Sequence, residues 1–180
     1  MVFFLGRDIL KEGLKTYFAK YKYQNTELKE FIAELSDASK RLGLQIDFKE
    51  WSDSWLTTAG CAEIELKYEQ NEETGIFTSV TLVQTPYNMA NTESNRLRVQ
   101  ALNIAVLDEN MKVIDEVRVE TSATASDTNI DRFEGPQDTK IHAFLINHGA
   151  HGYGKFGIDE MTLKAYETGF HKIESSLDRK

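Results

Sequence analysis

The pattern of apolar and polar positions changes its period near Gly60. Before this residue, apolar side chains recur with the period of a helix, and after it, for about ninety residues, they alternate as in strands. The first part contains two apolar stripes at helical spacing, which are Leu10, Leu14, Tyr17, Phe18 and Tyr21, then Leu28, Phe31, Ile32, Leu35 and Ala38. Two amphipathic helices are therefore predicted, with Asn25-Thr26 as the cap of the second and Gly43 at its end.

A short third helix is predicted after Asp47, because Glu50 follows three residues later, as in a capping box. Its apolar side would be aromatic, formed by Phe48, Trp51 and Trp55. Ala59-Gly60 has the composition of a helix end, since glycine adopts the left-handed conformation without a Cβ penalty. These short helices have few partners within residues 1–60, so we expect their apolar faces to need another surface.

Residues 61–157 have the pattern of short strands separated by turns, without a run of helical period. Ile64 and Leu66 alternate with charged residues, and the β-branched run 76–84 is expected to pair with them as a hairpin. Residues 85–95 contain Pro86 and no periodicity, which predicts a long loop. A turn at Asp108-Glu109-Asn110 is expected before a further strand over residues 112–121.

Two further segments bear on how these strands are arranged. Residues 96–99 alternate in one phase and residues 102–106 in the opposite phase, which predicts a bulge near Gln100 or a strand that changes its partner sheet. The nearly continuous apolar run 141–147 predicts a strand covered on both faces. With about six or seven short strands, a β-sandwich is the favoured architecture.

A helical period returns after Asp159-Glu160, where Leu163, Tyr166, Phe170 and Ile173 form an apolar stripe. The sequence therefore predicts an α+β protein in which helices, a sheet region and another helix follow one another. Residues 1–60 are predicted to form N-terminal helices. Residues 61–157 would form an antiparallel β-sandwich, and residues 158–180 the start of a further helical domain.

The composition is that of an ordinary globular chain, with 41% hydrophobic and 28% charged residues. The formal net charge is -8 and the basic residues are scattered, which disfavours a nucleic-acid partner. The single cysteine, Cys61, cannot form an internal disulfide, so we expect a cytoplasmic location. The apolar run 2–5 is too short for a membrane span or a signal peptide, and no membrane segment is expected.

Three histidines, His142, His148 and His151, lie near four glycines, Gly149, Gly152, Gly154 and Gly157. Neutral imidazoles bind zinc, but no cysteine or carboxylate accompanies these histidines at a recognised spacing. A dinucleotide site would need its glycines between a strand and the following helix of a βαβ unit. The glycines are therefore expected to mark turns and close backbone packing.

The remaining candidates for chemistry are Cys61 and the acidic pairs Glu72-Glu73, Asp108-Glu109 and Asp159-Glu160. Gly60 and Ala62 beside the cysteine favour a small packed thiol. The acidic pairs fit solvated turns or helix starts, where the helix dipole favours negative charge. We therefore predict no catalytic, cofactor-binding or metal-binding residues in this chain.

Three blocks within residues 1–60 resemble blocks of a known protein family. They are Gly6-Arg7-Asp8 with Gly13-Leu14-Lys15-Thr16-Tyr17-Phe18, the block YKYQNTEL at 21–28, and Trp55-Leu56-Thr57-Thr58-Ala59-Gly60. Their order and spacing resemble the end of the catalytic domain in the aminopeptidase N type of zinc peptidases, peptidase family M1. Residues 97–108 resemble a strand of that family's β-sandwich domain, and residues 145–160 its passage into a helical C-terminal domain. Residues 164–179 resemble the first helix of that last domain.

The resemblance implies a parent enzyme whose thermolysin-like domain carries a His-Glu-x-x-His helix, a downstream glutamate ligand, a Gly-x-Met-Glu-Asn segment and an oxyanion-stabilising tyrosine. These would lie before Met1, and no His-Glu-x-x-His occurs in this chain. We expect a piece cut at both ends, without zinc of its own, that spaces the catalytic and helical domains. Zinc and peptide substrates would be bound by the absent catalytic domain, and exposed apolar helix faces would self-associate.

An alternative interpretation is a stand-alone β-sandwich interaction module without peptidase activity. It would bind a partner through the exposed faces of Phe18, Tyr21, Trp51 and Trp55. A module of this kind is expected to be a monomer or to form one defined complex, whereas a severed piece is expected to associate through its apolar faces.

Overall fold

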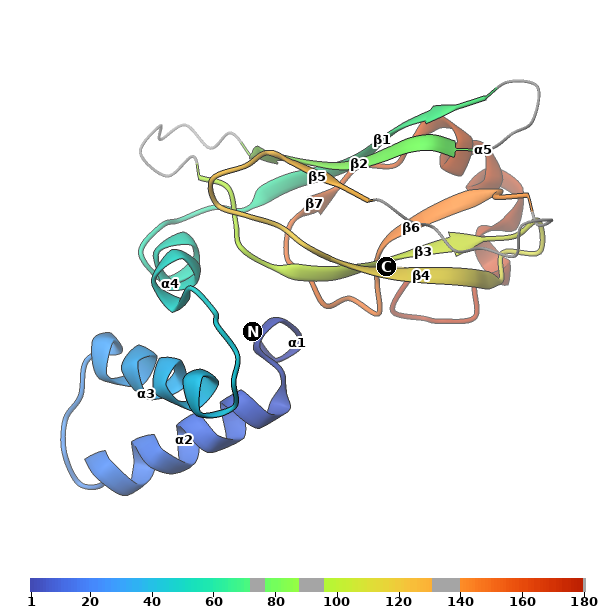
Figure 1. Ribbon diagram of the computed structural model, residues 1–180. Helices are drawn as coiled ribbons and strands as arrows, with labels where there is room; N and C mark the ends of the chain where they lie inside the picture. Colours follow the sequence, from blue (N-terminus) through green and yellow to red (C-terminus); the bar gives the residue numbers. More distant parts are fainter. Residues whose placement is uncertain (72–76, 88–95, 131–139, 180) are drawn as a thin grey trace. The chain divides into compact units, whose positions relative to one another are not determined.

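The computed structural model describes residues 1–71, 77–87, 96–130 and 140–179 (Figure 1). The chain divides into two compact units, Met1–Ala59 and Gly60–Lys180. Helices make up the first unit, and two β-sheets followed by a helix make up the second. This confirms the predicted α+β class with a C-terminal helix. None of the described helices is long and apolar enough to cross a membrane.

The first unit, called the helical unit below, contains α1 (Val2–Leu5), α2 (Arg7–Tyr21), α3 (Leu28–Arg41) and α4 (Phe48–Leu56). All of these helices contribute to one apolar core, formed by Leu5, Ile9, Leu35, Ala38 and Phe48. Helices α2 and α3 approach closely at Gly13, where a Cβ atom would lie 2.7 Å from Cδ2 of Leu35. The helical unit therefore has a core of its own.

Helix α3 does not begin with the predicted cap. Glu27 is the N-cap residue, and its side chain forms a reciprocal capping box with Glu30, whose carboxylate accepts the Glu27 N–H at 2.8 Å. The prediction that Asn25-Thr26 caps this helix is wrong. The Thr26 hydroxyl is instead hydrogen bonded to the hydroxyl of Tyr17.

The other helix ends of this unit agree with the sequence in part. Gly43 follows the end of α3 with a φ of 75°, and Asp47 caps α4 by accepting the Glu50 N–H at 2.8 Å, both as predicted. Helix α4, however, ends at Leu56, so the prediction that Ala59-Gly60 closes it is wrong.

Hydroxyl side chains explain the earlier end of α4. Thr57 donates to the carbonyl of Asp53 and Thr58 to the carbonyl of Ser54, each at 2.8 Å. These bonds satisfy carbonyl groups that the last turn of a helix leaves without partners.

The second unit contains two sheets with the strand orders β5-β2-β1-β7 and β4-β3-β6 (Figure 1). Its strands are β1 (Ala62–Gln70), β2 (Phe77–Pro86), β3 (Ala101–Leu107), β4 (Val113–Glu120), β5 (Asp127–Asn129), β6 (Ala143–His148) and β7 (Lys155–Phe156). The predicted hairpin of β1 and β2 is confirmed. Among the described strand pairs, β1 and β7 are parallel and the others antiparallel, so the sheets depart from a purely antiparallel sandwich.

Apolar residues from both sheets share one core, an arrangement that fits a β-sandwich. Its buried members are Ala62, Ile64, Leu66, Val80, Leu82, Leu102, Ile104, Val106, Val119, Ile130 and Phe144. Ile64 and Leu66 point into this core, as the alternation of β1 predicted.

The segment before β3 differs from its prediction. Residues 96–100 form no strand, although Arg98, Val99 and Gln100 are buried. The Arg98 N–H donates to Oε1 of Gln84 and the Gln100 N–H to Oγ1 of Thr121, so side chains replace the ladder partners of a strand. The register of β3 shifts between Asn103 and Ile104 against β6, and between Val106 and Leu107 against β4. The predicted bulge near Gln100 is therefore wrong in position, and the alternative, a strand that changes its partner sheet, is wrong because residues 96–100 belong to no strand.

Two loop predictions have different outcomes. The turn at Asp108-Glu109-Asn110 is confirmed, because Oδ1 of Asp108 accepts the backbone N–H groups of Asn110 and Lys112 at 2.8 and 2.9 Å. The long loop predicted over 85–95 begins later than expected, since Thr85 and Pro86 belong to β2. Most of that segment, and the pair Glu72-Glu73, lie outside the described residues.

Strand β6 is covered on both faces, as its apolar run predicted. Phe144 enters the core between the sheets, while Ala143 and Leu145 pack in a second cluster with Ala165 of α5 (Glu160–Gly169). The Phe144 N–H also donates to Oγ1 of Thr162 at 2.8 Å, which fixes α5 against the strand.

The apolar stripe predicted for α5 is confirmed for Ile173 and the partly buried Tyr166, which pack in the second cluster, but is wrong for its other two residues. The buried positions are Thr162, Ala165 and Gly169, whereas Leu163 is 51% and Phe170 is 38% exposed. Close packing requires small residues here, since a Cβ on Gly169 would lie 2.7 Å from Cγ of Met111. The helix also ends at Gly169 and is followed by the short 3-10 helix η2 (Phe170–Lys172), so no helix extends over 164–179.

Candidate functional site

The histidines and glycines singled out in the sequence lie around the turn that follows β6. Asn147, Gly149 and Ala150 have positive φ angles of 66°, 74° and 55°. The Asn147 side chain holds the turn, because its Oδ1 accepts the Gly152 N–H at 2.6 Å and its Nδ2 donates to the Gly152 carbonyl at 3.2 Å. A Cβ on Gly154 would lie 2.7 Å from the carbonyl oxygen of Ala62. The predicted role of these glycines in turns and close packing is confirmed.

His148 contacts a carboxylate that the sequence did not associate with it. Its Nδ1 lies 2.9 Å from Oδ2 of Asp178, close enough for an ion pair but without the alignment of a hydrogen bond. The other carboxylate oxygen of Asp178 accepts the Gly149 N–H at 2.8 Å. Asp178 follows His148 by thirty positions in the printed sequence, so no local spacing could indicate this contact.

The structure does not assemble the histidines into a larger ligand set. The His142 N–H donates to the carbonyl of Leu107 before β6, while His151 lies beside Gly149 in the turn. Within the described ranges, no group of three or more His, Cys, Asp or Glu side chains is placed to hold a metal ion. Cys61 is a free, half-buried thiol.

A cavity of about 400 Å³ lies beside this turn, between β6, α5 and the C-terminal residues. Tyr166 lines it and donates its hydroxyl to the carbonyl of Phe144 at 3.3 Å. Burial, together with the charges of Asp159 and Asp178, raises the pKa of Tyr166 to about 12. Tyr166 is therefore a neutral hydrogen-bond donor near neutral pH and is unsuited to acid–base catalysis there.

Tyr68, on β1 of the opposite sheet, also has a raised pKa. Its hydroxyl donates to Oδ1 of Asp159 at 2.9 Å, and burial with this hydrogen bond raises the pKa of Tyr68 to about 12. Asp159 also caps α5 by accepting the Thr162 N–H at 3.0 Å, which agrees with the predicted start of a helix at Asp159-Glu160. These contacts hold the start of α5 against the sandwich, so they serve the fold.

A buried polar network surrounds Arg98, whose side chain the sequence did not single out. Arg98 is 1% exposed, and its Nη2 donates to the carbonyl of Gly60 at 3.2 Å. The Arg98 carbonyl accepts the Thr121 hydroxyl at 2.7 Å. Burial lowers the pKa of the guanidinium. The first bond ties Arg98 to Gly60, just before β1, and the second ties it to Thr121, just after β4.

The helical unit has an open groove of about 1130 Å³ along α3 and α4. Its apolar lining consists of Leu28, Ile32, Ala33, Leu44, Ile46 and Phe48. Leu28 and Leu44 remain 43% and 50% exposed. This volume lies just above the range of usual small-molecule pockets, about 300–1,000 Å³.

One of the four residues that the alternative interpretation places on an exposed partner surface is buried. Phe18 is 63% exposed, and Tyr21 and Trp55 are half-buried, but Trp51 is only 6% exposed. A partner therefore cannot contact a free face of Trp51 without a rearrangement of α4.

The fold and these sites define an α+β protein in which a helical unit is joined to a sandwich-like unit. No protein-family model matches the chain. The chain is 25% identical over 183 residues to aminopeptidase N from Streptomyces lividans, an alignment that covers 99% of this chain and 20% of that protein. The similarity supports a relationship to aminopeptidase N. The chain spans only about one fifth of the length of this curated relative.

Proposed function

We propose that this chain is a non-catalytic portion of an aminopeptidase N-type zinc peptidase of the M1 family. The parent enzyme would remove N-terminal residues from peptides with zinc-activated water. The observation that carries the proposal is the similarity to aminopeptidase N, which covers 99% of the chain and thus both compact units. The 20% share of the relative supports a portion of a larger protein.

Within the parent, the proposed role of this portion is to space the catalytic and C-terminal helical domains. Two features of the surface support contacts with further protein. The helical unit has an apolar groove. Its acidic and basic residues are equal in number, so the formal net charge of -8 comes from the residues of the second unit. On the second unit, Leu163 and Phe170 expose apolar surface of the C-terminal helical region.

The proposal predicts that the purified 180-residue chain neither retains stoichiometric zinc nor hydrolyses an aminoacyl substrate. The reason is that the zinc ligands of the parent would lie in a domain that this chain lacks. Zinc content after dialysis is measured by elemental mass spectrometry, and hydrolysis with a fluorogenic aminoacyl amide. His148→Ala and His151→Ala test the turn histidines, and His171→Ala, at an exposed position outside the turn, is the matched control.

Zinc binding or hydrolysis that disappears in His148→Ala or His151→Ala but persists in His171→Ala would contradict the proposal. That result would place a metal site at the turn after β6 instead of in an absent domain.

A further inference from the structure

The cavity between β6, α5 and the C-terminal residues has the size of a small-molecule site. Its volume is about 400 Å³, within the usual range of about 300–1,000 Å³. The rings of Phe156, Tyr166 and Phe170 form part of its lining. The Tyr166 and Phe170 rings lie 5.4 Å apart between their centroids, tilted by 59°. Because Phe170 is 38% exposed, this aromatic wall reaches the protein surface and is open to a ligand from solvent.

Two carboxylates, those of Asp159 and Asp178, line the same cavity. Within the described part of the chain, no Lys, Arg or His side chain lines it. Oδ1 of Asp159 accepts hydrogen bonds from the Tyr68 hydroxyl at 2.9 Å and from the Thr162 N–H at 3.0 Å. Among the described residues, no donor is bonded to Oδ2 of Asp159. That oxygen therefore has room for a further hydrogen-bond partner.

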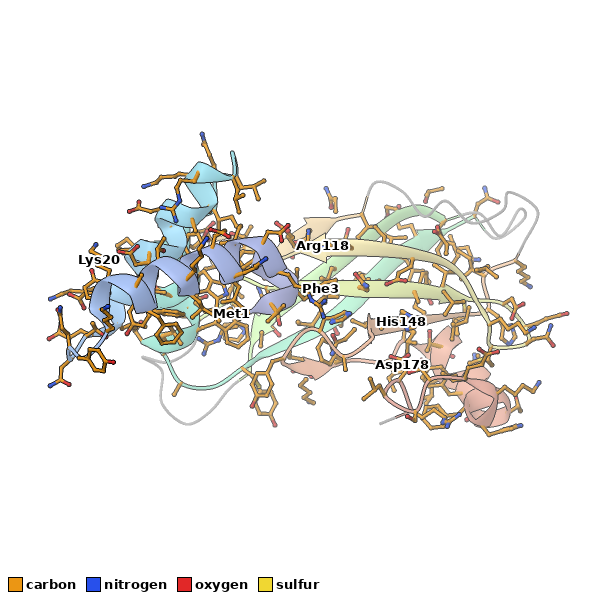
Figure 2. All side chains as sticks on the ribbon, turned by 90° about the horizontal axis from the view of Figure 1, so that it is seen from below. Met1, Phe3, Lys20, Arg118, His148 and Asp178 are labelled. Carbon is orange, nitrogen blue, oxygen red and sulfur yellow. The ribbon has the colours of Figure 1, made fainter. Side chains whose placement is uncertain are left out.

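The second carboxylate, Asp178, lies beside His148 near the end of β6 (Figure 2). Its side chain is 1% exposed. Oδ1 accepts the Gly149 N–H at 2.8 Å, whereas Oδ2 lies 2.9 Å from Nδ1 of His148 and is buried without a hydrogen bond. A carboxylate that is removed from water and short of donors is stabilised by a further positive charge nearby.

The charges around the cavity are negative in balance. Helix α5 begins at this cavity, but the N-terminus of a helix contributes only about half a positive charge, against the full negative charges of Asp159 and Asp178. A protonated His148 would still leave an excess of negative charge. Both carboxylates act on the Tyr166 hydroxyl, since their charges add to burial in raising its pKa. The wall of the cavity thus lies in the field of both carboxylates.

We propose that this cavity binds a small organic cation, a primary ammonium ion that carries an apolar or aromatic group. The ammonium group donates a hydrogen bond to Oδ2 of Asp159 and lies in the field of Asp178. The apolar group packs on the wall of Phe156, Tyr166 and Phe170, whose ring faces also attract a cation. This site does not depend on the relationship to aminopeptidase N, because all of its residues belong to the second unit.

The test is an NMR titration of the full 180-residue chain at low ionic strength, where charge interactions are weakly screened. The probes are 2-phenylethylammonium and 2-phenylethanol, which have nearly the same shape and differ in charge. The ammonium ion is expected to shift the amide signals of Phe144 and Thr162, which line the cavity, with a millimolar or lower Kd. The alcohol is expected to bind about tenfold more weakly, the scale of one hydrogen bond to a charged group.

Asp159→Asn removes one charge from the cavity but keeps a side-chain oxygen that can cap α5. It is expected to weaken binding of the ammonium ion about tenfold and to leave binding of the alcohol unchanged. Glu160→Gln is the matched control, because Glu160 is exposed, lies in the first turn of α5 and is not part of the cavity lining. This control should retain the wild-type affinity for the ammonium ion.

Phe170→Leu is the second variant and decides the question if Asp159→Asn fails to fold. Leucine keeps apolar volume at this partly exposed position but removes the aromatic face, so the ammonium ion should bind about two- to fivefold more weakly. Absence of binding by the ammonium ion, or equal affinity for the two probes, would overturn the proposal. So would an equal effect of Asp159→Asn and Glu160→Gln, or an unchanged affinity in Phe170→Leu.

Discussion

Replacing Phe144 with alanine is expected to lower the free energy of unfolding of the second unit by about 3–5 kcal/mol. Phe144 is 2% exposed and lies on β6, yet its ring centroid is 5.4 Å from that of Tyr68 and 5.3 Å from that of Phe77 on the opposite sheet. Its removal would leave a cavity between the sheets in addition to the lost transfer free energy. It would also remove two aromatic pairs.

Urea unfolding, followed by NMR signals of strand amides, measures this effect. Phe170→Ala is the matched control, because it deletes the same ring from a position that is 38% exposed and is expected to cost clearly less than Phe144→Ala. Equal losses in Phe144→Ala and Phe170→Ala would contradict a core shared by the two sheets.

Replacing Leu35 with alanine is expected to destabilise the helical unit by about 2–5 kcal/mol. Leu35 is fully buried and packs against Gly13 of α2, in the same core as Ile9 and Ala38. The backbone contact at Gly13 limits how far the helices can move to fill the cavity. A cost near the upper end of this range is therefore expected.

Tryptophan fluorescence measures the second effect selectively, because both tryptophans of the chain, Trp51 and Trp55, lie in the helical unit. Leu42→Ala, at a position 44% exposed just after α3, is the control and should change the midpoint little. Since the two units have separate cores, Leu35→Ala should move the fluorescence transition but leave the strand amide transition in place. A common shift of both transitions would show that the units unfold together.

Local pattern was sufficient for most elements of the fold. The stripe from Leu28 to Ala38 fixed α3, and the alternation at Ile64 and Leu66 fixed the inward face of β1. The N-caps Asp47 and Asp159 were predictable, because a side-chain oxygen and the N–H group it accepts lie within three residues of each other. In these cases the sequence contains both partners at short range.

Predictions failed where a distant partner decided the structure. Residues 96–99 alternate like a strand, but Gln84 and Thr121 side chains accept backbone N–H groups in and just after this segment. On α5 the larger residue Leu163 is exposed, because the surface beneath the helix accommodates only small residues such as Gly169. Helical periodicity identifies an apolar stripe but not the shape of the surface that covers it.

The candidate site was likewise predictable only where the sequence contains the interacting residues at short range. The glycines after β6 were assigned to turns and close packing from their type alone, and the structure agrees. The contact of His148 with Asp178 joins a strand end to a segment beyond α5, and no motif connects the two. The relationship to aminopeptidase N could be inferred from the order of three sequence blocks, because that signal does not depend on tertiary contacts.

The genomic sequence upstream of Met1 tests most directly the proposed origin of this chain in a larger zinc aminopeptidase. We expect an open reading frame that continues into this chain and encodes a His-Glu-x-x-His motif followed by a further glutamate ligand. A stop codon shortly before Met1, with no such motif in frame, would contradict this proposed origin.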